Sequence, residues 1–310
     1  MTIKALWRTC TAILALLACV YVGGTLIDHY QDLKTFSWSG AQWLLGGRWS
    51  LIWVAVLILS GINWAWLLEE KKKKNDRWSN VAIFGISQLG KYLPGNVAHH
   101  VGRFVMARGK DMSVAAIGRS MLFEVVLSFL VAACFFLLGV FLFDLGMWRE
   151  LTQLSNLNRT LIFFLTGIVV SLVLFRDRLR IWAKHYLAAE VLLMPPLRPL
   201  LKSVMVFSAS YLALGCVIDL HARFLFGFES SHWLWLSTVF SGAWIVGALM
   251  PGAPAGLGVR EVVLIATLTP VYGETVAVGL SITLRAITVT GDCLNFLIWS
   301  LWRSVKRGQI

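Results

Sequence analysis

The chain has 310 residues, of which 58% are hydrophobic and only 14% are charged, and its formal net charge is +12. This composition excludes an ordinary soluble domain and predicts an all-α polytopic membrane protein. The five cysteines lie in apolar stretches without Cys-x-x-Cys spacing, which argues against a disulfide framework or a zinc site. The positive charge is better explained by basic loops facing the cytoplasm and its anionic leaflet than by nucleic-acid binding.

About six full spans are predicted along the chain, at residues 5–27, 50–68, 113–143, 160–175, 203–226 and 275–302. Residues 28–49 are expected to form a loop between the first two spans. The loop at 69–77 holds five basic residues, so the positive-inside rule places it in the cytoplasm. Recognition of an anionic headgroup by this loop is the alternative. The resulting topology is a multi-pass protein of the cytoplasmic (inner) membrane with both termini cytoplasmic.

Five residues recur at a constant shift of 157 positions: Gly85, Gly90, Pro94, Gly95 and Arg103 return as Gly242, Gly247, Pro251, Gly252 and Arg260. In both copies a short apolar run ends at a Pro-Gly pair, which breaks helices, and is shorter than the roughly 20 residues of a span. The pattern predicts two re-entrant helical hairpins, at 79–108 and 234–270. Because three predicted crossings separate them, the second hairpin enters from the opposite face and the repeat is inverted.

The predicted organisation is a single membrane domain, 1–310. Residues 1–68 hold two N-terminal spans, 79–176 form the first half with its hairpin, and 203–303 form the second half. A basic, proline-containing stretch separates the halves. Short apolar segments interrupted by Gly and Pro at corresponding places in two halves are typical of transporter binding sites.

Ionisable side chains within predicted membrane segments are costly and therefore mark functional candidates. Arg103 and Arg260 are the strongest, because each follows a predicted helix break and a guanidinium matches the geometry of a headgroup phosphate. Helix N-termini restarting after the breaks would add amide donors. The alternative is structural pairing with a carboxylate such as Glu124 or Glu261.

Further candidates lie near the breaks and in the last span. Arg285 and Asp292, seven residues apart, share a helical face and could pair within the bundle or with the hairpins. Lys91 precedes the first break and could contact phosphate. His99 could hydrogen-bond a headgroup, with an interfacial structural role as the alternative; it and His100 are expected to point in different directions.

Tryptophans near predicted span ends, among them Trp53, Trp64, Trp235 and Trp299, are predicted to anchor the protein at the membrane interfaces. The sequence contains no P-loop, no Rossmann fingerprint, no Gly-x-Ser-x-Gly and no His-Glu-x-x-His. No catalytic residue, metal ligand or cofactor is therefore predicted.

Three stretches carry a resemblance to a known family: Gln88 to Arg103 with its Lys-Tyr-Leu-Pro-Gly core, Glu124, and Met250 to Glu261 with its glycine-rich Pro-Gly-Ala-Pro-Ala-Gly-Leu-Gly run. Together they resemble the membrane region of the lysylphosphatidylglycerol synthase/flippase family, in its stand-alone form. The resemblance covers about residues 5–303. It implies movement of an anionic lipid or a polyprenyl-phosphate-linked sugar across the bilayer, and it does not extend to the synthase activity, whose soluble domain is missing.

The leading hypothesis is a lipid flippase that acts on such a lipid. A membrane-embedded glycosyl- or aminoacyl-lipid transferase is the second hypothesis, for which Glu124, Asp292 and Glu261 are the only candidate bases or metal ligands. A non-transporting subunit of a glycolipid assembly complex is the third. The expected partner is the lipid substrate. A second copy of the chain or a glycolipid-pathway protein is a further candidate partner.

Overall fold

The computed structural model describes residues 20, 23–24, 27–28, 30, 40–68, 76–93, 97–110, 112–142, 195–250 and 253–307. Within these ranges the chain is helical and forms no strand. The fourth predicted span (160–175) and both Pro-Gly pairs (Pro94-Gly95 and Pro251-Gly252) lie outside the described residues, as does most of the first span.

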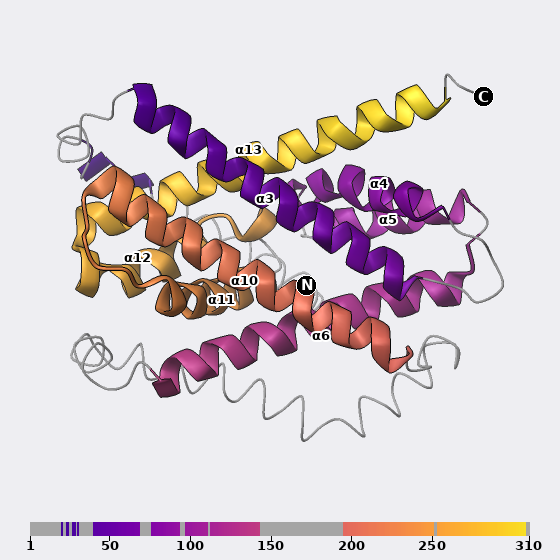
Figure 1. The fold of residues 1–310 in the computed structure, drawn as a ribbon, viewed down its shortest axis with the longest axis horizontal. Coiled ribbons are helices and arrows are strands. Elements are labelled where there is room, and N and C mark those ends of the chain that lie inside the picture. Colours follow the sequence, from indigo (N-terminus) through magenta and orange to yellow (C-terminus); the bar gives the residue numbers. More distant parts are fainter. Residues whose placement is uncertain are drawn as a thin grey trace, which may run out of the picture.

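Four long helices run roughly along the longest dimension of the molecule (Figure 1). They are α3 (Gly40–Leu67), α6 (Val114–Leu142), α10 (Leu197–Phe226) and α13 (Glu274–Arg307). The shortest has 28 residues, or about 42 Å at 1.5 Å per residue, which exceeds the thickness of a bilayer's hydrocarbon core. Five segments of the described chain are long and apolar enough to cross a membrane: Gly47–Leu67 of α3, Val114–Leu142, Leu197–Phe226, Glu274–Lys306 of α13, and Pro254–Tyr272. The prediction of an all-helical chain with membrane-length helices is confirmed.

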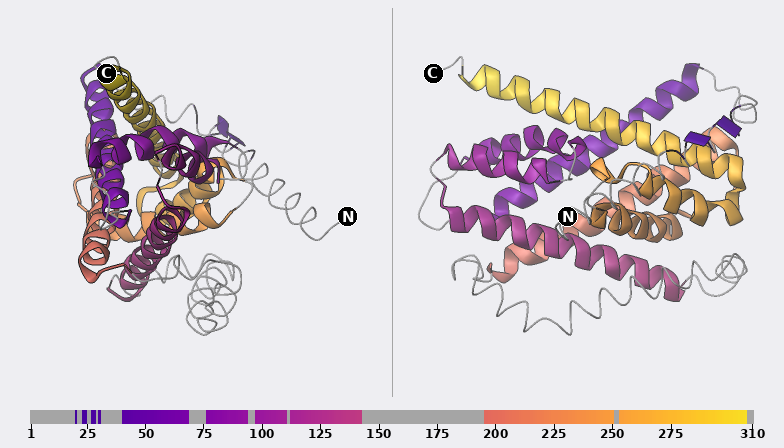
Figure 2. Two further views of the ribbon diagram at one scale, coloured as in Figure 1. Left: turned by 90° about the vertical axis from the view of Figure 1, so that its right-hand side faces the viewer. Right: turned by 180° about the vertical axis from the view of Figure 1, so that it is seen from behind.

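Two sets of shorter helices stand beside these long ones. The first helix pair consists of α4 (Arg77–Ser87), the 3₁₀ turn η1 (Gln88–Tyr92) and α5 (Ala98–Arg108). The second helix pair consists of α11 (Trp233–Leu249), the 3₁₀ turn η3 (Pro254–Gly256) and α12 (Val259–Tyr272). The two pairs lie toward opposite ends of the long axis (Figures 1 and 2), and η1 contacts η3 between them.

The glycines of the sequence repeat let helices approach closely. A Cβ atom on Gly85 would lie 2.2 Å from Trp299 of α13, and one on Gly242 would lie 2.7 Å from Phe136 of α6. Gly90 and Gly247 act within their own pair instead. A Cβ on Gly90 would lie 2.7 Å from the backbone N of His99, and one on Gly247 would lie 3.4 Å from the Cα of Gly256. Gly85 and Gly242 therefore have parallel packing roles, whereas the contact at Gly90 is closer than the one at Gly247.

Two helices begin earlier than their predicted spans. The loop predicted at 28–49 is wrong from residue 40 onward, because α3 begins at Gly40. Similarly, α10 begins at Leu197 rather than at 203. Pro199 does not prevent this, because it stands in the first turn, where a backbone N–H has no helical partner to lose.

Candidate functional site

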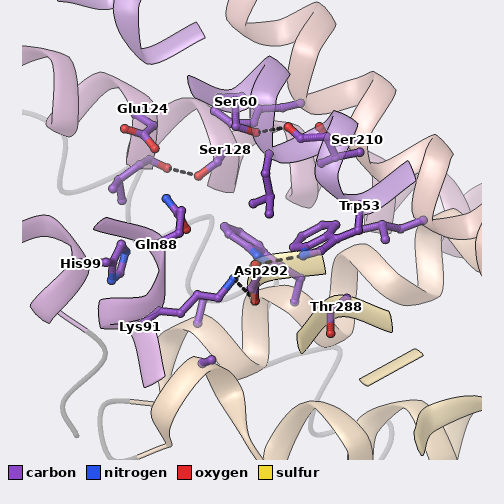
Figure 3. Close-up of a pocket in the computed structure, with 18 of the residues that line it drawn as sticks. Trp53, Ser60, Gln88, Lys91, His99, Glu124, Ser128, Ser210, Thr288 and Asp292 are labelled. Atoms are coloured by element: carbon purple, nitrogen blue, oxygen red, sulfur yellow. Dashed lines mark hydrogen bonds and ion pairs between the residues drawn. The ribbon is translucent and has the colours of Figure 1, made fainter. Parts of the chain in front are cut away.

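A cavity of about 360 Å³ opens between the two helix pairs and the four long helices (Figure 3). It lies at mid-length of the long helices: Trp53, Ser128 and Tyr211 line it, and each is within one residue of the midpoint of α3, α6 or α10. Its wall carries four cationic and two anionic side chains: Lys91, Arg103, Arg260, Arg285, Glu124 and Asp292. Charged side chains at mid-length of membrane-long helices require partners of opposite charge or a polar ligand. The partner of each one therefore indicates whether it is available to a ligand.

Asp292 is the centre of one polar network. Its side chain is fully buried and accepts hydrogen bonds from Lys91 Nζ at 2.8 Å, from the Tyr92 hydroxyl at 2.5 Å and from Trp53 Nε1 at 3.0 Å. Figure 3 shows Lys91 and Trp53 converging on the carboxylate. Lys91 thus pairs with a carboxylate in this structure, and the network joins η1 of the first helix pair to α3 and α13.

Arg103 is enclosed by the protein. Its side chain is fully buried, it donates through Nη1 to Glu124, and its guanidinium lies over the rings of Phe84 at 4.2 Å and Trp64 at 5.2 Å. Its Nε has no partner among the described residues. Of the two alternatives drawn from the sequence, the structure therefore has Arg103 in the ion pair with Glu124.

Arg285 lies on α13 and contacts the second helix pair. It forms an ion pair with Glu261 at 3.5 Å, and its Nη1 donates to the carbonyl oxygen of Ala255 at 3.2 Å. Its Nε and Nη2 are buried and have no hydrogen-bond partner in the described part of the chain. Glu261 does not line the cavity, but it balances one of the charges that do.

Arg260 differs from the other three cations. No carboxylate pairs with it in the described ranges, and its Nε is buried without a hydrogen-bond acceptor. Its guanidinium lies 5.7 Å from the ring centroid of Phe240. Because an unpaired cation in a low-dielectric interior is costly, this arrangement favours an anion in the cavity beside Arg260.

Hydroxyl groups line much of the remaining wall, and each donates its hydrogen elsewhere. The serine and threonine hydroxyls bond to backbone oxygens of their own helices, as seen for Ser60, Ser128, Ser210 and Thr288. The Tyr211 hydroxyl donates to the carbonyl oxygen of Ser128. These hydroxyls retain lone pairs, so toward the cavity they act as hydrogen-bond acceptors.

His99 and His100 both line the cavity, with ring centroids 3.9 Å apart, so the expectation that they point in different directions is wrong. They occupy the first turn of α5, where no preceding turn restricts the side-chain rotamer. Both Nδ1 atoms are buried without partners among the described residues. His99 thus stands where a polar group of a ligand would meet it.

The predicted interfacial role is wrong for several tryptophans. Trp53 lines the cavity, and Trp64, Trp235 and Trp299 are buried. Trp64 donates to Ser120 and Trp299 donates to Asn295. Since α3 begins ten residues before the predicted span, Trp53 lies at its middle rather than near its end.

The structure thus brings Lys91, His99, Arg260 and Arg285 to one cavity, together with Arg103 and its partner Glu124. The part that sequence reasoning missed is neutral: the indole of Trp53 and the serine hydroxyls. A serine in an apolar span carries no sequence signal that distinguishes a cavity wall from a helix interface.

The fold and site define an all-helical protein with membrane-length helices around a cation-rich cavity. No family model and no curated protein matches the chain.

Proposed function

We propose that the protein is a lipid flippase, which moves an anionic lipid or a polyprenyl-phosphate-linked sugar between the leaflets of the cytoplasmic membrane. The observation that carries the proposal is Arg260, a guanidinium without a carboxylate partner in the described chain, on the wall of a cavity at mid-length of membrane-long helices. A phosphate oxygen is the natural acceptor for such a planar donor group.

The arrangement of the helix pairs supports a transport role. In the first pair, neither α4 nor α5, at 11 residues each, is long enough to cross a bilayer. In the second pair, α11 has 17 residues and α12 has 14, and only η3 and α12 taken together reach a membrane-spanning length. We interpret the two pairs as re-entrant hairpins of an inverted repeat, because they lie toward opposite ends of the molecule and each packs one repeated glycine, Gly85 or Gly242, tightly against a long helix. Broken helices that meet near the midplane are the usual location of a transporter's binding site.

The sequence resemblance points the same way. The stretch from Gln88 to Arg103 and the stretch from Met250 to Glu261 resemble the membrane region of the lysylphosphatidylglycerol synthase/flippase family. In the structure these two stretches contribute Lys91, Arg103 and Arg260 to one cavity. The resemblance and the cavity therefore support a headgroup site at the same place.

The transferase alternative has less support. A membrane transferase requires a carboxylate that is available as a base or as a metal ligand. Each of the three candidates is already engaged by cationic donors: Glu124 by Arg103, Glu261 by Arg285 and Asp292 by Lys91. The flippase needs no such group.

Reconstitution into liposomes tests the proposal. The protein would be inserted into vesicles containing a trace of headgroup-intact, acyl-chain-labelled phosphatidylglycerol, and the label accessible from outside would be followed with a membrane-impermeant quencher. We expect protein-dependent movement of the label, and a loss of about tenfold or more in its rate for Arg260→Gln. Lys306→Gln removes the same charge from an exposed position far along α13 and is the matched control.

The outcomes separate the three hypotheses. Transfer of label between leaflets without chemical change supports the flippase. A new lipid product, detected when nucleotide-sugar or aminoacyl donors are supplied, would instead support the transferase. If neither movement nor product is seen across a panel of anionic and polyprenyl-phosphate lipids, the flippase proposal is wrong and a structural subunit is favoured.

A further inference from the structure

We infer that the cavity selects a headgroup with a single negative charge, a phosphodiester, whose remaining part is uncharged and carries hydroxyl groups. The inference rests on the proposed function for the statement that the ligand is a lipid. The inference is drawn from three observations: the net charge of the cavity, the positions of its unpaired hydrogen-bond donors, and the fact that its serine hydroxyls already donate to the backbone.

The formal charges set the number of negative charges. Within the part of the chain that the structure describes, four cationic side chains and two carboxylates line the cavity. Glu261 adds a third carboxylate from outside the wall through its ion pair with Arg285. Four positive charges minus three negative charges leave a net charge of +1, which one negative charge neutralises. A phosphate monoester or a diphosphate would carry an excess charge into a low-dielectric interior, which is costly.

The free donors mark where the phosphate binds. Among the described residues, four guanidinium nitrogens are buried without acceptors. Arg103 has one of them, its Nε, beside its ion pair with Glu124. Arg260 and Arg285 have the other three: Nε of Arg260, and Nε and Nη2 of Arg285. Both arginines line the cavity. The two non-bridging oxygens of a phosphodiester offer enough lone pairs for these three donors. Lys91, Arg103 and Arg285 each pair with a carboxylate, whereas Arg260 pairs with none in the described chain, and Arg260 and Arg285 together hold three of the four free donors. The phosphate therefore lies on the side of the second helix pair.

The hydroxyl wall determines the rest of the headgroup. Ser60, Ser128 and Ser210 donate to the backbone and present only lone pairs to the cavity. Groups that only accept are satisfied by ligand O–H or N–H donors. An ammonium group would satisfy them too, but it would raise the net charge beside Arg260. Hydroxyl groups, as on glycerol or a sugar, satisfy the wall at no cost in charge.

The size of the cavity is consistent with one such headgroup. Its volume of about 360 Å³ is near the lower end of the range of about 300–1,000 Å³ found for small-molecule sites. Aromatic rings close one side, where Trp244 lies 5.0 Å from Phe129 and 5.9 Å from Tyr211 between ring centroids. A single glycerol or sugar unit with its phosphate suits this volume better than an oligosaccharide.

The binding test uses the full chain in detergent and four short-chain phospholipids that share their acyl chains. Phosphatidylglycerol is a monoanion with two hydroxyls, phosphatidylmethanol is a monoanion without them, phosphatidic acid is a monoester that carries more than one negative charge above neutral pH, and phosphatidylethanolamine is a zwitterion. Quenching of tryptophan fluorescence reports binding, because Trp53 and Trp244 line the cavity. At pH 8, we expect phosphatidylglycerol to bind about tenfold or more tightly than each of the other three.

Each competing result overturns a defined part of the inference. Equal or tighter binding of phosphatidic acid overturns the single charge. Equal binding of phosphatidylmethanol overturns the role of the hydroxyls, and equal binding of phosphatidylethanolamine overturns the exclusion of an ammonium group.

Variants that remove a carboxylate test the inferred net charge of the cavity directly. Glu261→Gln and Asp292→Asn each raise the net charge of the cavity from +1 to +2, so each should shift the preference by about tenfold toward phosphatidic acid. Asp76→Asn makes the same change in the charge of the whole protein at an exposed position and should shift nothing. If Asp292→Asn does not fold, Glu261→Gln decides the test by itself. An unchanged preference in the folded variants overturns the inference.

The binding and transport measurements distinguish a failure of the inferred specificity from a failure of the proposed flippase function. A protein that prefers phosphatidylglycerol in detergent but moves no lipid in vesicles keeps the inferred specificity and contradicts the flippase. A protein that moves all four lipids at equal rates, and binds them equally, is a flippase without the inferred specificity.

Discussion

The first and second helix pairs each carry an arginine at the same position of the sequence repeat, yet the two side chains have different surroundings. Arg103 is fully buried, paired with Glu124 and covered by two aromatic rings. Arg260 has no carboxylate partner in the described chain and lies beside the open volume of the cavity. A repeated position therefore does not imply a repeated role. The partner of each guanidinium decides whether it stabilises the fold or is available to a ligand.

The largest effect is expected at the first arginine. Arg103→Ala leaves the carboxylate of Glu124 without its partner in the protein interior, which costs about 3–5 kcal/mol of stability. Thermal unfolding in detergent measures this loss. The double variant Arg103→Met with Glu124→Leu removes both charges and should recover most of the stability. If Arg103→Ala unfolds at the parental temperature, the contrast between the two arginines is wrong.

The next largest effect is expected from a conservative exchange at the second arginine. Arg260→Lys keeps the charge but loses the planar fork, so phosphatidylglycerol binding should weaken about tenfold, or about 1.4 kcal/mol, with little change in unfolding temperature. Arg103→Lys should show the opposite: binding near the parental value and a stability loss of about 1 kcal/mol from the rings of Phe84 and Trp64. Titration and thermal unfolding of both variants measure the two quantities. Equal behaviour of the two lysine variants would contradict this assignment of roles.

Much of this comparison could be anticipated from the sequence, but not all of it. Glu124 was a foreseeable partner for Arg103, since both were predicted to lie within the membrane in the first half of the chain. For Asp292, pairing with a hairpin is one of the two alternatives drawn from the sequence, but its particular hydrogen-bond donors could not be predicted. Its donors Trp53, Lys91 and Tyr92 are at least 200 positions away in the sequence, and only the assembled bundle brings them together.

Errors of the sequence reasoning have a common physical origin. The apolar run that begins at residue 50 predicts a later start than α3 has, so Trp53 is predicted near the edge of a helix whose middle it occupies. Helical periodicity predicts that His99 and His100 diverge, but both lie in the first turn of α5, where it constrains side-chain direction least. The length of an apolar run predicts that a helix forms. Where that helix begins and ends depends on its packing against other segments, which the run itself does not encode.

The repeated glycines extend the comparison to backbone packing. An alanine at Gly90 would place its Cβ 2.7 Å from the backbone N and 2.9 Å from the Cα of His99, which cannot move without displacing α5. Gly90→Ala should therefore cost about 1–3 kcal/mol. At Gly247 the nearest atoms are at 3.4 Å, and the helix gains up to about 1 kcal/mol from alanine. Unfolding temperatures of the two variants should differ in this order, and the reverse order would contradict the packing.

The smallest effect is expected where the first helix pair meets the end of α13. Lys306 and Asp76 form an exposed ion pair, so Lys306→Gln should cost less than about 1 kcal/mol. The hydrogen bond from Lys306 lowers the pKa of Asp76 below its usual value of 3.8. A lowered carboxyl pKa stabilises the fold above about pH 4, and this contribution is lost as the pH falls through the lowered value. Unfolding measured from pH 7 to pH 3 should show the variant and the parent converge at acidic pH; a gap that widens there would contradict this.

One helix holds both halves of the polar interior. Arg285 of α13 bonds to the second helix pair, and Asp292, seven residues further along the same helix, bonds to the first. Seven residues span about 10 Å of a stiff rod. Pulling either pair away from α13 separates opposite charges out of reach of water, whereas tilting α13 with both pairs attached separates none. If the protein moves lipid as proposed, the least costly motion is therefore one in which both helix pairs rock together with α13 as a rigid unit.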